Sequence, residues 1–203
     1  GAYYFNRGKL LARNKAYAYA GAEFERATRY PHLQTFAVYE ALGRTRYNQK
    51  RWNDAVLALQ ESLQRHWNNE RAHYYLGLCL GHSGNYQEAV TRLRKAVELN
   101  PLSVTFRLEY GKALGLAGDA RAAVEALQVA LSLDANHAEI YHALGVNLRR
   151  AGNLEAAVDV YQKAIAIEPN NPAILNSLGV AYLNQSNFEA AHQIFQRIVE
   201  GWP

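Results

Sequence analysis

The side chains with the greatest capacity for chemistry are one cysteine and seven histidines, in a chain of 203 residues. Cys79 and His82 stand one helical turn apart, a spacing that could place a thiolate and an imidazole on the same metal ion. Two ligands do not complete a site, and the other histidines show no ligand spacing. We therefore predict no metal site and no cofactor. Cys79 lies between Leu78 and Leu80, and we interpret it as a buried apolar residue.

Motifs for catalysis do not occur in the sequence. It contains no HExxH, GxSxG, P-loop or CxxC pattern. Gly81-His82-Ser83-Gly84 is rich in glycine, but no strand precedes it, so it indicates a helix end rather than a phosphate-binding loop. We predict that the chain is not an enzyme and that its function is binding.

Cations with tyrosines among them are the remaining chemical signal. Lys and Arg number 22 against 18 Asp and Glu, which gives a net charge of +4. Residues 1–103 hold 15 basic and 8 acidic residues, a net charge of +7, whereas residues 104–203 hold 7 and 10, a net charge of −3. Such a gradient favours an acidic protein partner or an oriented self-association.

The elements that must position these cations are revealed by the spacing of glycine. Six of the 14 glycines fall 34 or 35 residues apart, and an alanine follows each after twelve residues. Such a period indicates a repeat architecture. The six glycines are Gly8, Gly43, Gly77, Gly111, Gly145 and Gly179, and the alanines are Ala20, Ala55, Ala89, Ala123, Ala157 and Ala191. The repeats run over residues 1–35, 36–69, 70–103, 104–137, 138–171 and 172–203, with one extra residue near Tyr30-Pro31-His32 in a loop.

The apolar positions within each repeat predict two helices, each with one apolar face. With the glycine counted as position 8, positions 4, 7, 8 and 11 share one helical face, and positions 17, 20, 24, 27 and 28 share a second. A glycine inside a helix costs about 1 kcal/mol relative to alanine, so its recurrence indicates that a larger side chain would collide with the partner helix. Between the helices, glycine ends the first and Asn or Asp caps the next at Gly84-Asn85, Gly118-Asp119 and Gly152-Asn153. A proline at position 32 ends the second helix at Pro101, Pro169 and Pro203.

This pattern resembles that of the tetratricopeptide repeat (TPR) family, W-x-x-L-G-x-x-Y…A-x-x-x-F…P with a 34-residue period. The fifth repeat carries the pattern through Tyr141, Leu144, Gly145, Leu148, Ala157, Tyr161 and Pro169. The first two repeats are looser, because Arg7, Arg46 and Trp67 depart from it. The resemblance implies an all-α fold, a right-handed α-solenoid superhelix of six helix-turn-helix repeats. It also implies one domain over residues 1–203, whose first helices line a concave face.

The resemblance also implies where a partner would bind. In this family the contacts come from positions 2, 5, 9, 12 and 13 of each first helix, with position 6 beside them. Here those positions include Phe5, Lys9, Arg13, Glu40, Arg44, Tyr47, Asn48, Arg71, Tyr74, His82, Leu108, Lys112, Glu139, His142, Arg149, Arg150, Asn176 and Asn184. We predict a peptide-binding surface formed by Lys9, Arg13, Arg44, Tyr47, Asn48, Arg71, Tyr74, His82 and Lys112. Its cations and tyrosines suit a protein or peptide with acidic groups, although ordinary solvated helix faces are the alternative.

Two subtypes of the family and one other repeat class are not indicated. The carboxylate clamp for chaperone tails needs Lys and Asn at positions 5 and 9 and Asn at position 6 of the next repeat, where this chain has Phe5, Lys9 and Ala41. The asparagine ladder of the repeat arm of O-linked N-acetylglucosamine transferase is missing at position 6. RNA readers with a 35-residue period lack the glycine–alanine pair, so a nucleic-acid partner is not favoured.

The sequence thus predicts a non-catalytic scaffold that binds a protein or peptide segment in a concave groove. Two alternatives stay open, namely the substrate-recruiting or regulatory arm of a larger enzyme such as a glycosyltransferase, and a bacterial envelope scaffold for polysaccharide export. No run of about 18 apolar residues occurs, so we expect no membrane insertion. The sequence does not decide between the cytoplasm and a bacterial periplasm.

The two ends of the chain carry expectations of their own. The absence of methionine predicts a piece of a longer protein. Residues 188–201 form the last predicted helix, and terminal repeats of a solenoid need a polar outer face. That helix would instead present Phe195, Ile198 and Val199, followed by Trp202. We expect either further repeats beyond it or end-to-end self-association through these four residues.

Overall fold

The computed structural model describes residues 1–201, in which twelve α-helices and one short 3-10 helix, η1 (Pro31–Leu33), follow one another. The first helices of the six repeats are α1 (Ala2–Arg13), α3 (Phe36–Asn48), α5 (Glu70–His82), α7 (Val104–Leu116), α9 (Ala138–Arg150) and α11 (Pro172–Asn184). The second helices are α2 (Tyr17–Thr28), α4 (Trp52–Arg65), α6 (Tyr86–Leu99), α8 (Ala120–Leu133), α10 (Leu154–Ile167) and α12 (Phe188–Glu200). The all-α fold and the register of six helix-turn-helix repeats are therefore confirmed. The extra residue of the first repeat falls in the connection that contains η1.

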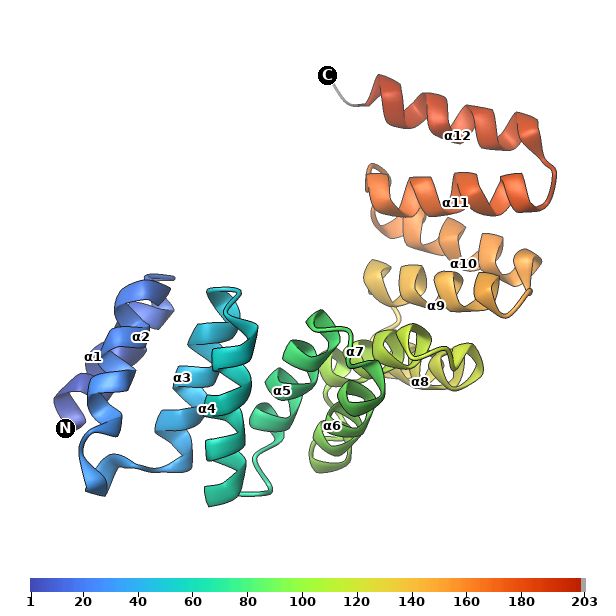
Figure 1. The fold of residues 1–203 in the computed structure, drawn as a ribbon. Helices are drawn as coiled ribbons and strands as arrows, with labels where there is room; N and C mark the ends of the chain where they lie inside the picture. The colour runs from blue at the N-terminus through green and yellow to red at the C-terminus, as the bar shows by residue number, and fades with distance from the viewer. Residues whose placement is uncertain (202–203) are drawn as a thin grey trace. The chain divides into compact units, whose positions relative to one another are not determined.

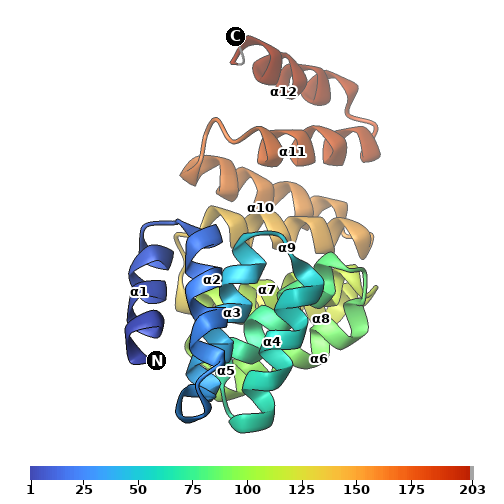
Figure 2. The same ribbon diagram turned by 60° about the vertical axis from the view of Figure 1, so that its left-hand side comes forward.

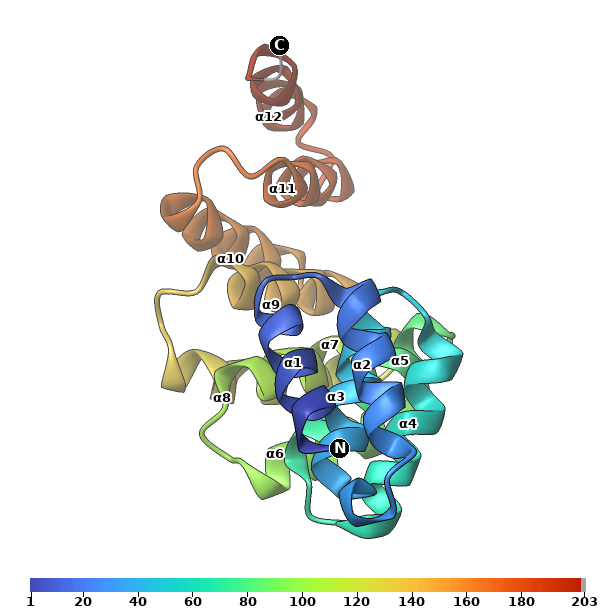
Figure 3. The same ribbon diagram turned by 90° about the vertical axis from the view of Figure 1, so that its left-hand side faces the viewer.

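The chain divides into two compact units, Gly1–Pro101 and Leu102–Pro203, each with three helix pairs. In the first unit the helices pack in chain order, and α1, α3 and α5 also contact one another in succession (Figure 1). The second unit repeats this arrangement, with α9, α10, α11 and α12 layered in order (Figure 2) and α9 touching both α7 and α11. Figure 3 shows α11 and α12 nearly end-on, side by side as a pair. In each unit the first helices thus form one continuous row.

The glycine and alanine columns hold each helix pair together. A Cβ atom added to any of the six repeat glycines would come within 2.5–2.6 Å of a side chain on the partner helix, a distance that requires a structural shift. The six side chains are Phe24, Leu59, Leu93, Leu127, Tyr161 and Phe195. The alanine that follows each glycine is at most 1% exposed. The expected collision is therefore confirmed, and it explains why glycine is kept inside six helices.

The turns within the pairs follow the prediction with one exception. Gly84, Gly118 and Gly152 adopt positive φ angles of 80°, 93° and 84°, which an L-residue rarely takes. Asp119 and Asn153 then accept backbone N–H groups of α8 and α10 in their side chains. Asn85 occupies the same N-cap position of α6, but its side chain forms no cap hydrogen bond, so that part of the prediction is wrong. Its backbone carbonyl accepts the N–H of Ala89, as the carbonyls of Asp119 and Asn153 do at the equivalent positions.

The interior leaves little reactive chemistry exposed. Cys79 is fully buried in the core of the first unit, and burial raises the pKa of its thiol to about 12. Within residues 1–201 no three His, Cys, Asp or Glu side chains gather into a metal-binding group. Among the described helices none combines the length and the apolar character needed to span a bilayer.

Candidate peptide-binding surface

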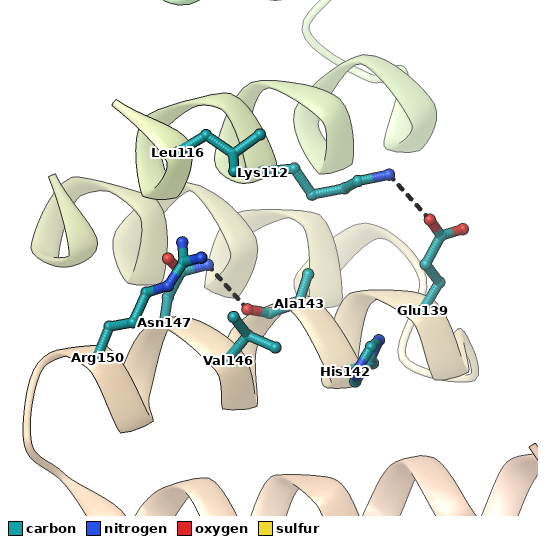
Figure 4. A pocket seen from close by; sticks show the side chains of 8 residues that line it. All are labelled: Lys112, Leu116, Glu139, His142, Ala143, Val146, Asn147 and Arg150. Atoms are coloured by element: carbon teal, nitrogen blue, oxygen red, sulfur yellow. Dashed lines mark hydrogen bonds and ion pairs between the residues drawn. The ribbon is translucent and has the colours of Figure 1, made fainter. Parts of the chain in front are cut away.

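A pocket of about 200 Å³ lies between α7 and α9, two neighbouring first helices of the second unit (Figure 4). Lys112 and Leu116 extend toward it from α7. The wall on α9 consists of residues spaced along one helical face, namely Glu139, His142, Ala143, Val146, Asn147 and Arg150. Apolar side chains line its centre, and charged groups stand near both ends. We call this the α7/α9 pocket.

Lys112 is neutralised at one end of the pocket. Its Nζ lies 2.7 Å from Oε1 of Glu109 and 3.1 Å from Oε1 of Glu139, so one cation bridges two carboxylates on neighbouring helices. Burial would lower the pKa of Lys112, but the hydrogen bonds and charges of Glu109 and Glu139 outweigh it and raise that pKa. Lys112 is therefore held as a structural cation, with both partners in place.

Arg150 closes the other end and retains unused donors. Its Nη1 donates to the carbonyl oxygen of Gly115 at 2.9 Å, which anchors the guanidinium across the two helices. No carboxylate pairs with Arg150 among the described residues. Since a guanidinium has five N–H donors in a fixed plane, the remaining ones can receive an acceptor from a ligand.

Asn147 explains how the helices approach so closely at this end. It is 3% exposed, and its Nδ2 donates to the carbonyl oxygen of Ala143 at 2.8 Å. A Cβ atom at position 115 would lie 2.1 Å from Oδ1 of Asn147, so only Gly115 leaves room for this amide. The pairing of Gly115 with Asn147 thus fixes the floor of the pocket before any ligand arrives.

His142 connects the α7/α9 pocket to the next repeat. Its Nε2 lies 2.8 Å from Oγ of Ser177 on α11. Burial lowers the pKa of His142, Glu139 raises it and Lys112 lowers it, and the net direction is downward. The imidazole is therefore neutral at neutral pH, and it contributes shape and hydrogen bonding rather than charge.

The row of first helices in the first unit is more strongly basic than the α7/α9 pocket, but some of its cations have acidic partners. Arg44 pairs with Glu40 at 3.7 Å on the same helix. Burial raises the pKa of Glu40, while the charges of Arg44 and Arg71 oppose the rise. Arg71 is exposed on α5, and its charge also acts on the Glu40 carboxylate. This surface keeps an excess of positive charge.

An aromatic cluster includes three of the predicted residues, Tyr47, Tyr74 and His82. The Tyr47 ring lies 5.2 Å from Trp52, 5.4 Å from Tyr75 and 5.9 Å from His82. His82 stacks on Trp52 at 4.2 Å with an interplanar angle of 9°. Tyr74 meets Tyr75 edge-on at 5.1 Å. Tyr47 and His82 are thus brought together, and much of their ring surface is used in packing.

The other predicted residues lie apart from this cluster. Lys9 is exposed on α1 and places its Nζ 4.8 Å from the centre of the Phe5 ring. Arg13 is exposed at the end of α1. Asn48 donates to the carbonyl oxygen of Arg44 at 3.0 Å. Eight of the nine predicted residues belong to the first unit, and Lys112 alone belongs to the α7/α9 pocket.

The predicted site omitted most of the residues that form the α7/α9 pocket. Val146 and Leu116 stand at positions 9 and 13 of their repeats, which are positions of the predicted concave face. A rule that accepted apolar residues at those positions would have included both. Asn147 stands outside those positions, and its role depends on Gly115 of the preceding repeat, so no signal within one repeat identifies it.

The C-terminal residues predicted for self-association have different environments. Phe195 packs against Gly179 within its own helix pair and is half-buried. Ile198 is also half-buried, whereas Val199 is 74% exposed. Trp202 lies outside the described residues. Self-association through this end stays a prediction, and Val199 is its most accessible described apolar residue among the four.

Comparisons with known proteins were made for the sequence and for the fold. A profile described as the cytochrome c-type biogenesis protein H TPR domain matches residues 25–167, and a tetratricopeptide repeat profile matches residues 148–201. A search of curated protein sequences gave no significant match.

Several solved structures share the fold. A crystal structure of MamA protein is 26% identical, covers 83% of this chain and 92% of that chain, and has a TM-score of 0.73. MamA from residue 41 to its end, from Desulfovibrio magneticus RS-1, is 22% identical over 81% and 93% of the two chains, with a TM-score of 0.75. YrrB, described as a TPR protein with an unusual peptide-binding site, is 24% identical over 85% and 88%, also with a TM-score of 0.75. The chain therefore belongs to the tetratricopeptide repeat family, in the group described by the TPR domain of cytochrome c-type biogenesis protein H.

Proposed function

We propose that this protein is a non-catalytic scaffold that binds a peptide segment of another protein on the row of first helices. The observation that carries the proposal is the α7/α9 pocket, which combines an apolar centre with an anchored guanidinium at one end. Ligand sites commonly pair apolar walls with a few fixed polar groups. A side chain of the partner would rest on Leu116 and Val146, and an acceptor group would reach Arg150.

An acidic segment suits this row better than a neutral one. Arg150 has no carboxylate partner among the described residues, so its guanidinium is available to a carboxylate of the ligand. Carboxylates form bidentate, charge-assisted hydrogen bonds with guanidinium groups. Lys112 contributes less than the sequence suggested, because Glu109 and Glu139 already neutralise it.

The state of the reactive side chains supports a binding role rather than catalysis. Cys79 is buried with its pKa raised to about 12, so it is a thiol at neutral pH rather than a nucleophilic thiolate. His142 on α9 is hydrogen-bonded to Ser177 on α11. The resemblance to YrrB is one of fold, and it indicates only that such repeats can carry a peptide site.

The test is a selection from a random displayed peptide library against the whole chain, followed by affinity measurement. We expect selected peptides to combine an apolar with an acidic residue, and Val146→Glu to abolish their binding. Arg121→Glu is the matched control, because Arg121 lies on α8 with its side chain 92% exposed. Peptides that bind Val146→Glu as tightly as the unaltered protein would exclude the α7/α9 pocket as their site.

A further inference from the structure

A second pocket lies in the first unit and is lined mainly by residues of second helices. It has a volume of about 380 Å³ and is formed between α4 and α6, the second helices of two successive repeats. Leu63 of α4 and Leu76 of α5 are almost fully buried and provide an apolar base. Gln60, Gln64, Trp67 and Arg92 complete the lining. We call this the Trp67 pocket.

Trp67 breaks the repeat pattern at this place. It occupies position 32, where the third, fifth and sixth repeats have proline, and its side chain is 56% exposed. The backbone before it resembles that of the proline-containing repeats. His66 has φ −152° and ψ 92°, close to the values of Asn100 before Pro101 and of Glu168 before Pro169. The backbone before Trp67 therefore resembles the turn before Pro101 and Pro169. The indole stands where those repeats have a proline ring.

The indole is exposed, yet it is held in place. The carbonyl oxygen of Trp67 accepts a hydrogen bond from Nε2 of His73 at 2.9 Å, and the two rings meet edge-on at 4.9 Å. His73 is fully buried, and burial lowers its pKa, so the ring is neutral. Two residues later, Asn69 is tied to the backbone of α5 and to Ser62. An aromatic side chain that is already fixed offers a large contact area and loses little conformational entropy on binding, as in the hot spots of protein interfaces.

Arg92 gives this pocket a charge. Its guanidinium lies 5.9 Å from the Trp67 ring centre, and one nitrogen pairs with Glu88 at a distance of 3.6 Å. Its Nε is buried and has no hydrogen-bond partner. A guanidinium has five N–H donors, so the contact with Glu88 leaves donors of Arg92 that can receive an acceptor in the pocket. The first unit also carries a net charge of +7, which complements an acidic ligand.

We propose that the Trp67 pocket is a second binding site, which takes a peptide segment of a partner protein with an aliphatic side chain next to a carboxylate. The aliphatic group packs on Trp67 and Leu63. The carboxylate accepts from Arg92, and the amides of Gln60 and Gln64 bond to the peptide backbone. The site is independent of the α7/α9 pocket, so the protein engages two segments through different helices.

The test uses the whole chain labelled with 5-fluorotryptophan, whose fluorine resonances report Trp67 separately from Trp52 and Trp202. Trp67→Pro identifies the Trp67 resonance, and we expect this variant to fold because the proline-containing repeats share its backbone. The probes are the capped dipeptides acetyl-Leu-Glu-amide and acetyl-Leu-Gln-amide. We expect the Leu-Glu probe to shift the Trp67 resonance, and the Leu-Gln probe to bind about tenfold more weakly.

Two variants separate a local contact from a general effect of charge. We expect Arg92→Gln to weaken the binding of the Leu-Glu probe about tenfold. Lys95→Gln removes the same charge one turn away on α6, and we expect it to change the affinity for this probe little. Equal losses in the two variants, equal binding of the two probes, or an unmoved Trp67 resonance would overturn the proposal. A Trp67 shift on dilution of the protein without any peptide would identify a second copy of the chain as the occupant, and would overturn it as well.

Discussion

Single residues decide how close the helices of this protein come. Gly77 and Gly81 both lie in α5, one helical turn apart, yet their surroundings differ. A Cβ atom at Gly77 would lie 2.6 Å from Leu93, whereas a Cβ atom at Gly81 would meet no atom within 4 Å. The first glycine is required by packing, and the second is not.

This contrast predicts opposite effects of the same substitution. Gly77→Ala should lower the free energy of unfolding by about 1–3 kcal/mol, because the added methyl group overpacks the helix pair. Gly81→Ala should raise it by about 0.5–1 kcal/mol, because alanine favours a helix over glycine. Urea unfolding of the two variants measures both effects. Equal changes in the two would show that the repeat glycine has no special packing role.

His142 predicts a dependence of stability on pH. Its pKa is lowered in the folded protein from about 6.5, so the folded state binds its proton less readily than the unfolded state does. Its contribution to stability is complete above pH 6.5 and is lost as the pH falls toward the lowered value. Unfolding free energies between pH 7.5 and about 5.5 should therefore decline less in His142→Gln than in His192→Gln, an exposed control. Parallel declines would show that His142 does not contribute.

For single residues, the sequence predicted the packing contacts better than it predicted which cations are available to a ligand. The repeat glycines were identified correctly, because one local collision recurs in every repeat. The availability of each cation was not predictable. Lys112 is neutralised by Glu109, three residues away, and by Glu139 in the next repeat. Such pairing depends on the geometry between helices, which the composition of one helix face does not contain.

The helix ends were also predicted only in part from the sequence. The start of each helix pair agrees with the predicted repeat boundaries, because the apolar period and the turn residues act together. Asn85 was nevertheless wrongly expected to cap α6 through its side chain. Residue type and position were correct there, but the side chain does not take the capping geometry. The floor of the α7/α9 pocket was missed because Asn147 acquires its role only against Gly115 of another helix.

The caps provide a prediction with its own control. Oδ1 of Asp119 accepts the backbone N–H of Ala122 at 2.9 Å at the start of α8. Asp119→Ala should lower the free energy of unfolding by about 1 kcal/mol, a usual cost of losing an N-cap. Asn85→Ala should cost distinctly less, because its side chain makes no cap bond. Thermal or urea unfolding compares the two, and an equal cost would mean that the cap bond of Asp119 adds nothing.

For the whole molecule, the uneven charge is the main electrostatic feature. The first unit carries +7 and the second −3, although the sum is only +4. Exposed arginines on the row of first helices lie within this basic part, so an acidic peptide would be attracted over a distance that salt shortens. The overall composition of the chain conceals this division.

Charge reversal on this row tests the basic surface. For an acidic peptide that binds the first helices of the first unit, the double variant Arg44→Glu with Arg71→Glu should weaken binding at least tenfold and reduce the dependence of the affinity on salt. Fluorescence anisotropy at low and high ionic strength measures both quantities. An unchanged affinity together with an unchanged salt dependence would show that these arginines do not face the ligand.

Photo-crosslinking shows whether a peptide lies in the α7/α9 pocket. A benzophenone amino acid in place of Val146 would lie in the pocket, whereas the same group in place of Arg121 would lie exposed on α8. After irradiation with a library-selected peptide, we predict a crosslink from position 146 and none from position 121. A crosslink from position 121 alone, or from neither position although the peptide is bound, would show that the peptide binds outside this pocket.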